Sequence, residues 1–240
     1  MKLVVDIGNT SITFAVFDNE NIVKKFRIPS RISESVENYK KELKNNIEYK
    51  IDECVIISVV EGLELIIKNA CDNLFGINSK IFSVEDAPEI KLNVAHPETV
   101  GADRIANAKA ATKKYSLPVI VVDLGTATTF DIISREKEFF GGIILAGLDM
   151  QLRALNQFTS KLPKYSVKKS ENAIGVDTET AIMSGVVRGS AAAIDGLIAQ
   201  CELEMQDKAT VVLTGGYAEF ISEYMSRKPD FIDADLTLRV

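Results

Sequence analysis

The feature that most constrains this chain is a motif that occurs twice. Residues 4–10 and 121–128 each contain an apolar run, an aspartate, one apolar residue, a glycine and small polar residues. The two aspartates, Asp6 and Asp123, lie 117 positions apart in a chain of 240 residues. A repeat on this scale predicts two related halves that face each other.

The elements around the two motifs follow the same plan. Apolar or alternating segments at 2–5, 12–18 and 22–28 predict a three-stranded meander, and segments 119–125, 128–134 and 138–145 predict a second one. In the rest of the chain, short apolar runs predict strands, and apolar residues at three- and four-residue spacing predict helices. The strands are expected at 54–60, 80–84 and 209–216, and the helices at 33–46, 61–75, 102–115, 147–160, 177–206 and 217–227.

This order of elements predicts an α/β fold of two domains. Ser116-Leu117-Pro118 follows a helical pattern and would end it, because proline cannot continue a helix. We therefore place the boundary near 115–118, which gives an N-terminal half at 1–115 and a C-terminal half at 116–240.

The repeated motif has the chemistry of a phosphate-binding loop. A glycine between two strands lets the backbone turn sharply, so that successive N–H groups point at one spot where an anion binds. Gly8-Asn9-Thr10 and Gly125-Thr126 would cradle phosphates in this way, and Asp6 would help to hold Mg²⁺ through water. Two ordinary hairpin turns are the alternative, since Asp and Gly favour turns in any case.

A third glycine element, Thr214-Gly215-Gly216, follows the strand expected at 209–216. Taken alone it predicts only a strand-to-helix turn. In the order of the three elements, however, the chain resembles the superfamily of acetate and sugar kinases, heat-shock chaperones and actin. That resemblance implies two ribonuclease H-like (actin-like ATPase) domains with ATP in a cleft between them.

The segment Pro97–Arg104 carries a separate signal. Asp103 at the expected start of a helix reads first as a helix cap, which contributes about 1 kcal/mol. Arg104 follows directly, and its guanidinium suits a carboxylate or a phosphate. An aspartate beside such an anchor can alternatively act as a base next to an anionic substrate.

With its flanking residues, this segment resembles the signature of the type III pantothenate kinases. The same resemblance extends to both aspartate loops, to Gly141–Gly147 and to Ile174–Thr178. It implies ATP-dependent phosphorylation of pantothenate to 4'-phosphopantothenate, the first step of coenzyme A biosynthesis, by a cytoplasmic homodimer with its acceptor site near the interface.

The resemblance also implies residue roles. Asp103 would be the base for the pantothenate hydroxyl, and Asp123 would serve a monovalent cation, K⁺ or NH₄⁺. The residues that would contact ATP are Asp6, Ile7, Gly8, Asn9, Thr10, Ser11, Ile12, Thr13 and Thr126. Those that would contact pantothenate are Gly101, Ala102, Asp103, Arg104 and Thr178.

Four positions depart from the family pattern. Val94 stands for the usual tyrosine, His96 for asparagine, Ala146 for proline and Val176 for a basic residue. These changes leave the ATP loops intact and favour one rival, a kinase of this fold for another small hydroxylated or carboxylated acceptor. A nucleotide-binding regulator without catalysis is the other rival, against which the three aspartates argue.

Composition narrows the partners. The net charge of −6 makes nucleic acid an unfavourable partner, and no apolar run reaches the 18 residues that a membrane span needs. Three scattered cysteines fit free thiols in a reducing compartment, and the single His96 with no paired cysteines excludes the usual zinc sites.

A stripe of small and apolar residues marks the long segment 177–206. It predicts either packing on the chain's own sheet or a helix pair across a two-fold axis. The stripe comprises Ala181, Ile182, Gly185, Val186, Gly189, Ala192, Ala193, Gly196 and Leu197.

Overall fold

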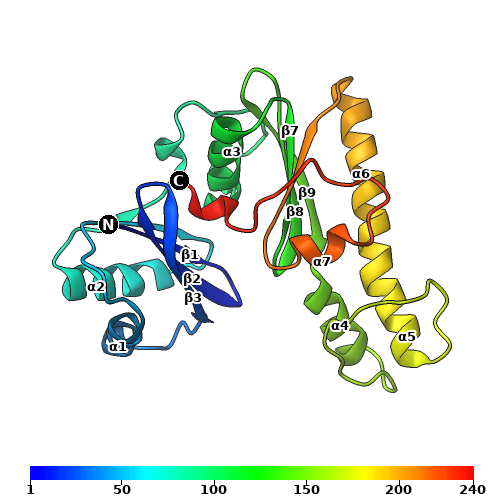
Figure 1. Ribbon diagram of the computed structural model, residues 1–240, viewed down its shortest axis with the longest axis horizontal. Helices are drawn as coiled ribbons and strands as arrows, with labels where there is room; N and C mark the ends of the chain where they lie inside the picture. Colours follow the sequence, from blue (N-terminus) through cyan, green and yellow to red (C-terminus); the bar gives the residue numbers. More distant parts are fainter. The chain divides into compact units, whose positions relative to one another are not determined.

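The computed structural model describes all 240 residues, which form two compact units. The first comprises Met1–Ile90, His96–Ala110 and Thr237–Val240, and the second comprises Lys91–Ala95 and Ala111–Leu236. Each unit is built around its own sheet (Figure 1). The boundary that we place near 115–118 separates the two halves of the predicted duplication. It stays a prediction.

The sheet of the first unit has the strand order β3-β2-β1-β4-β5. Strands β1 to β3 form an antiparallel meander, as the sequence predicts, and β4 and β5 run parallel to β1. The expected strand at 80–84 is only two residues long. The strands are β1 (Lys2–Ile7), β2 (Ser11–Asp18), β3 (Asn21–Pro29), β4 (Glu53–Ser58) and β5 (Lys80–Ile81).

Two helices, α1 (Val36–Asn46) and α2 (Leu63–Phe75), contribute to the core on one face of this sheet. Leu43 and Ile67 pack there with buried strand residues such as Phe14. A third helix, α3 (Ala102–Lys114), begins in the first unit and ends among residues of the second. The other face of the sheet carries Asp6, which does not belong to this core.

The sheet of the second unit has the order β11-β10-β7-β8-β9-β6. Strands β7 to β9 form an antiparallel meander, while β10 and β11 continue parallel to β7. This order repeats that of the first sheet, with β6 added at the edge, so the predicted duplication is confirmed. The strands are β6 (Lys91–Leu92), β7 (Val119–Leu124), β8 (Ala127–Ile133), β9 (Glu138–Ala146), β10 (Thr210–Thr214) and β11 (Phe231–Ile232).

The helices of the second unit are α4 (Leu148–Gln157), α5 (Thr178–Met183), α6 (Gly189–Met205) and α7 (Ala218–Ser222). A π-helical segment, Ser184–Arg188, joins α5 to α6, so the helix expected at 177–206 is nearly continuous (Figure 1). Helix α7 is shorter than the expected 217–227, and the chain beyond it bonds Asp195 through the Ser226 N–H at 2.7 Å. Short 3₁₀ segments lie at Val84–Asp86, Pro97–Thr99 and Leu236–Leu238.

The long α5–α6 helix is apolar on two sides. Its buried side includes Met183, Val187, Ile194 and Ile198, which belong to the core of the second unit. Most of the predicted stripe is exposed, so packing on the chain's own sheet is wrong for those residues. The exposed members are Ala181, Gly185, Gly189, Ala192, Ala193 and Gly196.

By length and composition alone, Thr178–Met205 would suffice to cross a membrane, although no apolar run of that length was expected from the sequence. Its most apolar window has a mean hydropathy of 1.3, and a third of that window is buried. A single helix of this kind is weak evidence for a span, since core helices of soluble proteins pass the same test. Its buried side already packs in a protein core.

Candidate active site

The first phosphate-loop candidate, Gly8–Ser11, joins β1 to β2. The N–H of Gly8 donates to the carbonyl oxygen of Ser11 at 3.0 Å, which closes the turn. Ser30, directly after β3, holds the loop from outside. Its Oγ donates to the Gly8 carbonyl oxygen at 2.5 Å, and its N–H donates to that of Thr10 at 3.1 Å. The side chains of Asn9 and Thr10 remain exposed, as donors for a ligand require.

A row of polar side chains crosses the sheet behind this loop. Asp6 on β1 pairs with Thr13 on β2, and Thr13 pairs with Arg27 on β3. The Nε of Arg27 donates to the Thr13 hydroxyl at 3.2 Å. Neither Ser30 nor Arg27 was among the sequence-predicted site residues, because each is an ordinary strand or turn residue until its partners are known.

The acceptor-segment candidate lies at the same edge of this sheet. Val59, which follows β4, donates its N–H to the carbonyl oxygen of Ile7 at 3.1 Å. A Cβ built on Gly101 would lie 3.5 Å from the side chain of Val59 and 2.5 Å from Oδ1 of Asp103. The first unit therefore brings Gly101–Arg104 to the edge where β1 ends after Asp6.

The carboxylate of Asp103 is largely buried and accepts a backbone hydrogen bond at the start of a helix. Helix α3 begins at Ala102, and Asp103 accepts the N–H of Arg104 at 2.8 Å. Asp103 lies inside the first turn of the helix, and the Arg104 N–H that it accepts also donates to the carbonyl oxygen of Gly101 at 3.1 Å. A cap residue precedes its helix and accepts an N–H two or three residues further on, so Asp103 does not have the expected geometry of a helix cap. Burial raises the pKa of Asp103, and the Arg104 N–H and charge oppose that shift. A carboxylate with a raised pKa is a stronger base when it is ionised.

The second phosphate-loop candidate joins β7 to β8 in the second unit. The N–H of Gly125 donates to the carbonyl oxygen of Ala127, two residues on, at 3.0 Å, whereas Gly8 in the first loop bonds a residue three positions on. The N–H of Gly147 donates to the Thr126 carbonyl oxygen at 3.2 Å. A Cβ on Gly147 would lie 2.5 Å from the carbonyl oxygen of Gly125, so β9 can approach the loop only through a glycine.

Asp123, at the end of β7, lies against the glycine pair that follows β10. Gly215 has a φ of +87°, and a Cβ there would overlap Oδ1 of Asp123. The N–H of Tyr217 donates to the Leu124 carbonyl oxygen at 3.2 Å, which ties the two segments together. The third glycine element is therefore part of the second loop's support.

The oxygen atoms near Asp123 could serve as ligands of a loosely bound cation. Thr214 pairs with Asp123 across β10 and β7, and its hydroxyl is buried without a hydrogen-bond partner. The structure contains no cluster of three His, Cys, Asp or Glu side chains that could hold a metal. A cation at Asp6 or Asp123 would thus take other oxygen ligands, such as water, hydroxyl or phosphate, which fits Mg²⁺ or a monovalent ion.

Asp149, near the start of α4, is another residue that the sequence did not single out. It accepts the hydroxyl of Tyr217 at 2.7 Å. Burial and this carboxylate raise the pKa of Tyr217 to about 12, so the phenol stays protonated and keeps donating. The bond holds the segment after Gly215 in place.

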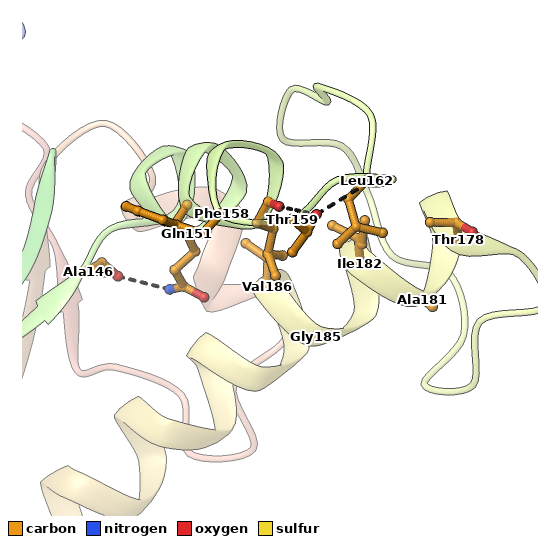
Figure 2. Close-up of a pocket in the computed structure, with 12 residues that line it drawn as sticks. Ala146, Gln151, Phe158, Thr159, Leu162, Thr178, Ala181, Ile182, Gly185 and Val186 are labelled. Atoms are coloured by element: carbon orange, nitrogen blue, oxygen red, sulfur yellow. Dashed lines mark hydrogen bonds between the residues drawn. The ribbon is translucent and has the colours of Figure 1, made fainter.

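An apolar pocket of about 840 Å³ lies elsewhere in the second unit, between α4 and the α5–α6 helix (Figure 2). Thr178 lines it, and the side chain of Gln151 donates to the Ala146 carbonyl oxygen at 2.9 Å beside it. Phe158 also lines the pocket, although its side chain is 82% exposed. None of the three aspartates that the sequence singles out, Asp6, Asp103 and Asp123, lines this pocket.

The comparisons with known proteins identify relatives of this chain. The family model described as type III pantothenate kinase matches residues 2–200, which include both loops, Gly101–Arg104 and Thr178. A type III pantothenate kinase of Finegoldia magna is 37% identical, over 98% of this chain and 93% of its own length.

Solved structures agree on the fold. A putative Baf family transcriptional activator from Campylobacter jejuni has a TM-score of 0.60, with 23% identity over 99% of this chain and 94% of its own. A putative N-acetylglucosamine kinase from Porphyromonas gingivalis has a TM-score of 0.52, with 12% identity over 100% of this chain and 97% of its own. The expected actin-like class is confirmed, and the cleft between the domains stays a prediction.

Proposed function

We propose residue roles for this chain, which belongs to the type III pantothenate kinase family. It is an ATP-dependent kinase that phosphorylates pantothenate to 4'-phosphopantothenate for coenzyme A biosynthesis. The observation that carries the site assignment is that Asp103 and the loop after Asp6 lie at one edge of one sheet. One unit thereby supplies both a base and a phosphate cradle.

The phosphates of ATP bind the two glycine loops in this proposal. Both loops are hairpin connections in which a glycine N–H donates to a backbone carbonyl oxygen across the turn, and the first loop is one residue longer than the second. Each follows a strand that carries an aspartate near its end. Of the other residues expected to contact ATP, Ile7 and Ile12 have side chains buried in the core of the first unit, so they could reach the nucleotide only through their backbone. Neutral donors of this kind hold phosphate oxygens without adding charge.

Asp103 acts as the general base. It accepts the proton of the pantothenate hydroxyl as that oxygen attacks the γ-phosphorus of ATP, and the bond to the ADP oxygen breaks. The raised pKa of Asp103 suits a group that must take a proton and release it again. A positioned base of this kind contributes about 10²–10⁴-fold to the rate.

Two cations complete the nucleotide site. Asp6 holds Mg²⁺ through water, and Asp123, with the buried Thr214 hydroxyl beside it, serves K⁺ or NH₄⁺. When bound, the ions supply positive charge that offsets the phosphates. Asp123 alone would repel ATP, which is why an unneutralised carboxylate is an unsuitable neighbour for a phosphate loop.

The acceptor binds through Gly101–Arg104 and Thr178. Arg104, directly after the base, anchors the pantothenate carboxylate through its planar guanidinium. Thr178 begins α5 beside the exposed stripe of the α5–α6 helix and lines the apolar pocket. The exposed stripe and the pocket together form an apolar surface, and such surfaces commonly bind another protein.

We further propose that two copies of the chain pair through this helix, in the cytoplasm. Gly185, Gly189 and Gly196 have open space where a Cβ would be, so another helix can approach closely. The adjacent segment adds the highly exposed Ile174 and Val176. A two-fold axis would cover these residues and bring Thr178 close to the interface.

Another acceptor is the remaining alternative for the substrate. Val94 contacts the position of a Cβ on Gly141 at 3.6 Å, and Val176 is 92% exposed, so neither supplies the polar groups usual in the family. The decisive experiment is a coupled assay with ATP, Mg²⁺, K⁺ and either pantothenate or a panel of small hydroxy acids. Turnover with another acid and none with pantothenate would reject the assignment, and no turnover with any acceptor would favour a non-catalytic regulator.

A further inference from the structure

Arg27 on β3 lies in the same row of the sheet as Asp6. Asp6 pairs with Thr13 and Thr13 pairs with Arg27, and side chains paired across neighbouring strands point to the same face. The opposite face carries the core residues Phe14 and Phe26, whose rings stack at 4.8 Å. Arg27 therefore shares the face of Asp6, away from the core.

The guanidinium of Arg27 is held at one point only. Its Nε donates to the hydroxyl of Thr13 at 3.2 Å, and Thr13 is 8% exposed. No other hydrogen bond and no ion pair engages Arg27, so its two Nη groups have no protein partner. The side chain is exposed at this position, where a ligand can reach it.

The strand that carries Arg27 also supports the first loop. Two residues after Arg27, Pro29 pairs with Ser11, and the next residue, Ser30, bonds the carbonyl oxygens of Gly8 and Thr10. The end of β3 is thus attached to the loop through both its backbone and a side chain. Arg27 lies on the same strand, two residues before this attachment begins at Pro29.

We propose that Arg27 is a nucleotide-binding residue whose Nη groups contact phosphate oxygens of ATP at the Gly8–Ser11 loop. This rests on the proposed placement of the phosphates there. The loop donors are neutral and Asp6 is negative, so a guanidinium on this face adds a protein-borne positive charge beside the phosphates. A guanidinium fixed at Nε presents its two Nη groups as a fork, the geometry that phosphates accept.

Lys25 provides a matched control. It lies two residues earlier on the same strand, is exposed, and pairs with Ala15 rather than with Thr13. The test measures the Kd of ATP, ADP and adenosine by calorimetry, with Mg²⁺ and K⁺ and without pantothenate, for the wild type, Arg27→Gln and Lys25→Gln. Arg27→Gln should raise the Kd of ATP about tenfold and leave that of adenosine unchanged. Lys25→Gln should change either by less than about twofold.

Two results would overturn the role of Arg27. One is a Kd for ATP in Arg27→Gln that equals that of Lys25→Gln, and the other is equal weakening of ATP and adenosine, which indicates a structural effect. Should Arg27→Gln fail to fold, Arg27→Lys keeps the charge and the aliphatic stem but loses the fork. It should weaken ATP about threefold, and unchanged affinity would reject the proposal.

The same wild-type protein separates this inference from the proposed function. If it phosphorylates pantothenate while Arg27→Gln and Lys25→Gln bind ATP equally, the kinase assignment stands and the role of Arg27 is rejected. If the wild type binds no ATP, both are rejected.

Discussion

The carboxylate of Asp103 occupies the space that a side chain at Gly101 would take. A Cβ built on Gly101 would lie 2.5 Å from Oδ1 of Asp103, which is closer than real side chains approach. The carboxylate uses this space to accept the Arg104 N–H at 2.8 Å. The absence of a side chain at Gly101 therefore fixes where the proposed base lies.

Replacing that glycine should misplace the base. In Gly101→Ala the new methyl group must push the Asp103 carboxylate aside, and we expect kcat to fall at least about tenfold because small displacements of a catalytic group are costly. The Kd of ATP should stay within about twofold, since the first loop is untouched. Steady-state kinetics and calorimetry measure the two quantities, and a normal kcat would contradict the placement of Asp103.

Asp103→Asn should lower kcat by about 10²–10⁴-fold and preserve ATP binding. The wild-type kcat should fall on acidification at a pH above the ordinary aspartate value of 3.8, because burial raises the pKa of this group. A pH profile of kcat measures that limb. A turnover of Asp103→Asn within about threefold of the wild type would leave Asp103 as a structural residue only.

The ionised carboxylate of Asp103 should favour catalysis but lower the stability of the folded protein. A raised pKa means that burying the ionised carboxylate disfavours folding at neutral pH, and that this penalty disappears as the pH falls below 3.8. We expect Asp103→Asn to have the higher Tm at pH 7 and the two proteins to converge near pH 3.5. A lower Tm for the variant at pH 7 would show that the bond to Arg104 outweighs the cost of burial.

Ser30→Ala should loosen the first loop without unfolding the protein. It removes the bond to the Gly8 carbonyl oxygen, so we expect the KM of ATP to rise several-fold while the KM of pantothenate stays unchanged. Ser35→Ala is the matched control, because Ser35 caps α1 by accepting the Asn38 N–H at 3.2 Å. That variant should lose about 1 kcal/mol of stability and keep its KM for ATP. Equal kinetic effects in the two variants would reject the positioning role.

The sequence predicted the duplication because a strand, an aspartate and a glycine recur in one order, and local patterns of this kind survive in any context. It could not identify Ser30 or Asp149, since their roles depend on partners at Gly8 and Tyr217 that are distant along the chain. Long segments of helical spacing were predicted well. Helix α7 was overestimated, and the residues beyond its end make a tertiary bond, from the Ser226 N–H to Asp195, that no local pattern indicates.

The sequence also could not predict whether the stripe on α5–α6 faces the core or the solvent. Small residues satisfy both packing on a sheet and packing on another helix, and the pattern of Gly189, Ala192 and Gly196 is the same in either case. Only the fold shows that Val187 and Ile194 take the buried side. The rest of the stripe then remains exposed.

Activity should require a monovalent cation in addition to Mg²⁺. Asp123 brings a negative charge to the second phosphate loop, and the unpaired Thr214 hydroxyl offers a neutral ligand beside it. Replacing K⁺ by choline should raise the KM of ATP or abolish turnover, and K⁺ should raise the Tm of the wild type but not of Asp123→Ala. Full activity with Mg²⁺ as the only metal cation would refute this role for Asp123.

The chain should form a homodimer through the exposed stripe, and Gly189 gives this prediction a distinctive sign. Glycine inside a helix costs about 0.5–1 kcal/mol relative to a better helix former, and Gly189 has open space around its Cβ position. In a monomer, Gly189→Arg should therefore leave the Tm unchanged or raise it. In a dimer, the same change places a large charged side chain in the interface and should lower both the Tm and the mass measured by light scattering.

Glu219→Arg on α7 is the control, because it adds the same side chain at an exposed position outside the stripe. It should leave the mass and the Tm near those of the wild type. A wild-type mass near the 26.3 kDa of one chain, together with full kinase activity, would defeat the prediction. So would a Gly189→Arg variant that is more stable than the wild type and has the same mass, since the helix would then have no partner to lose.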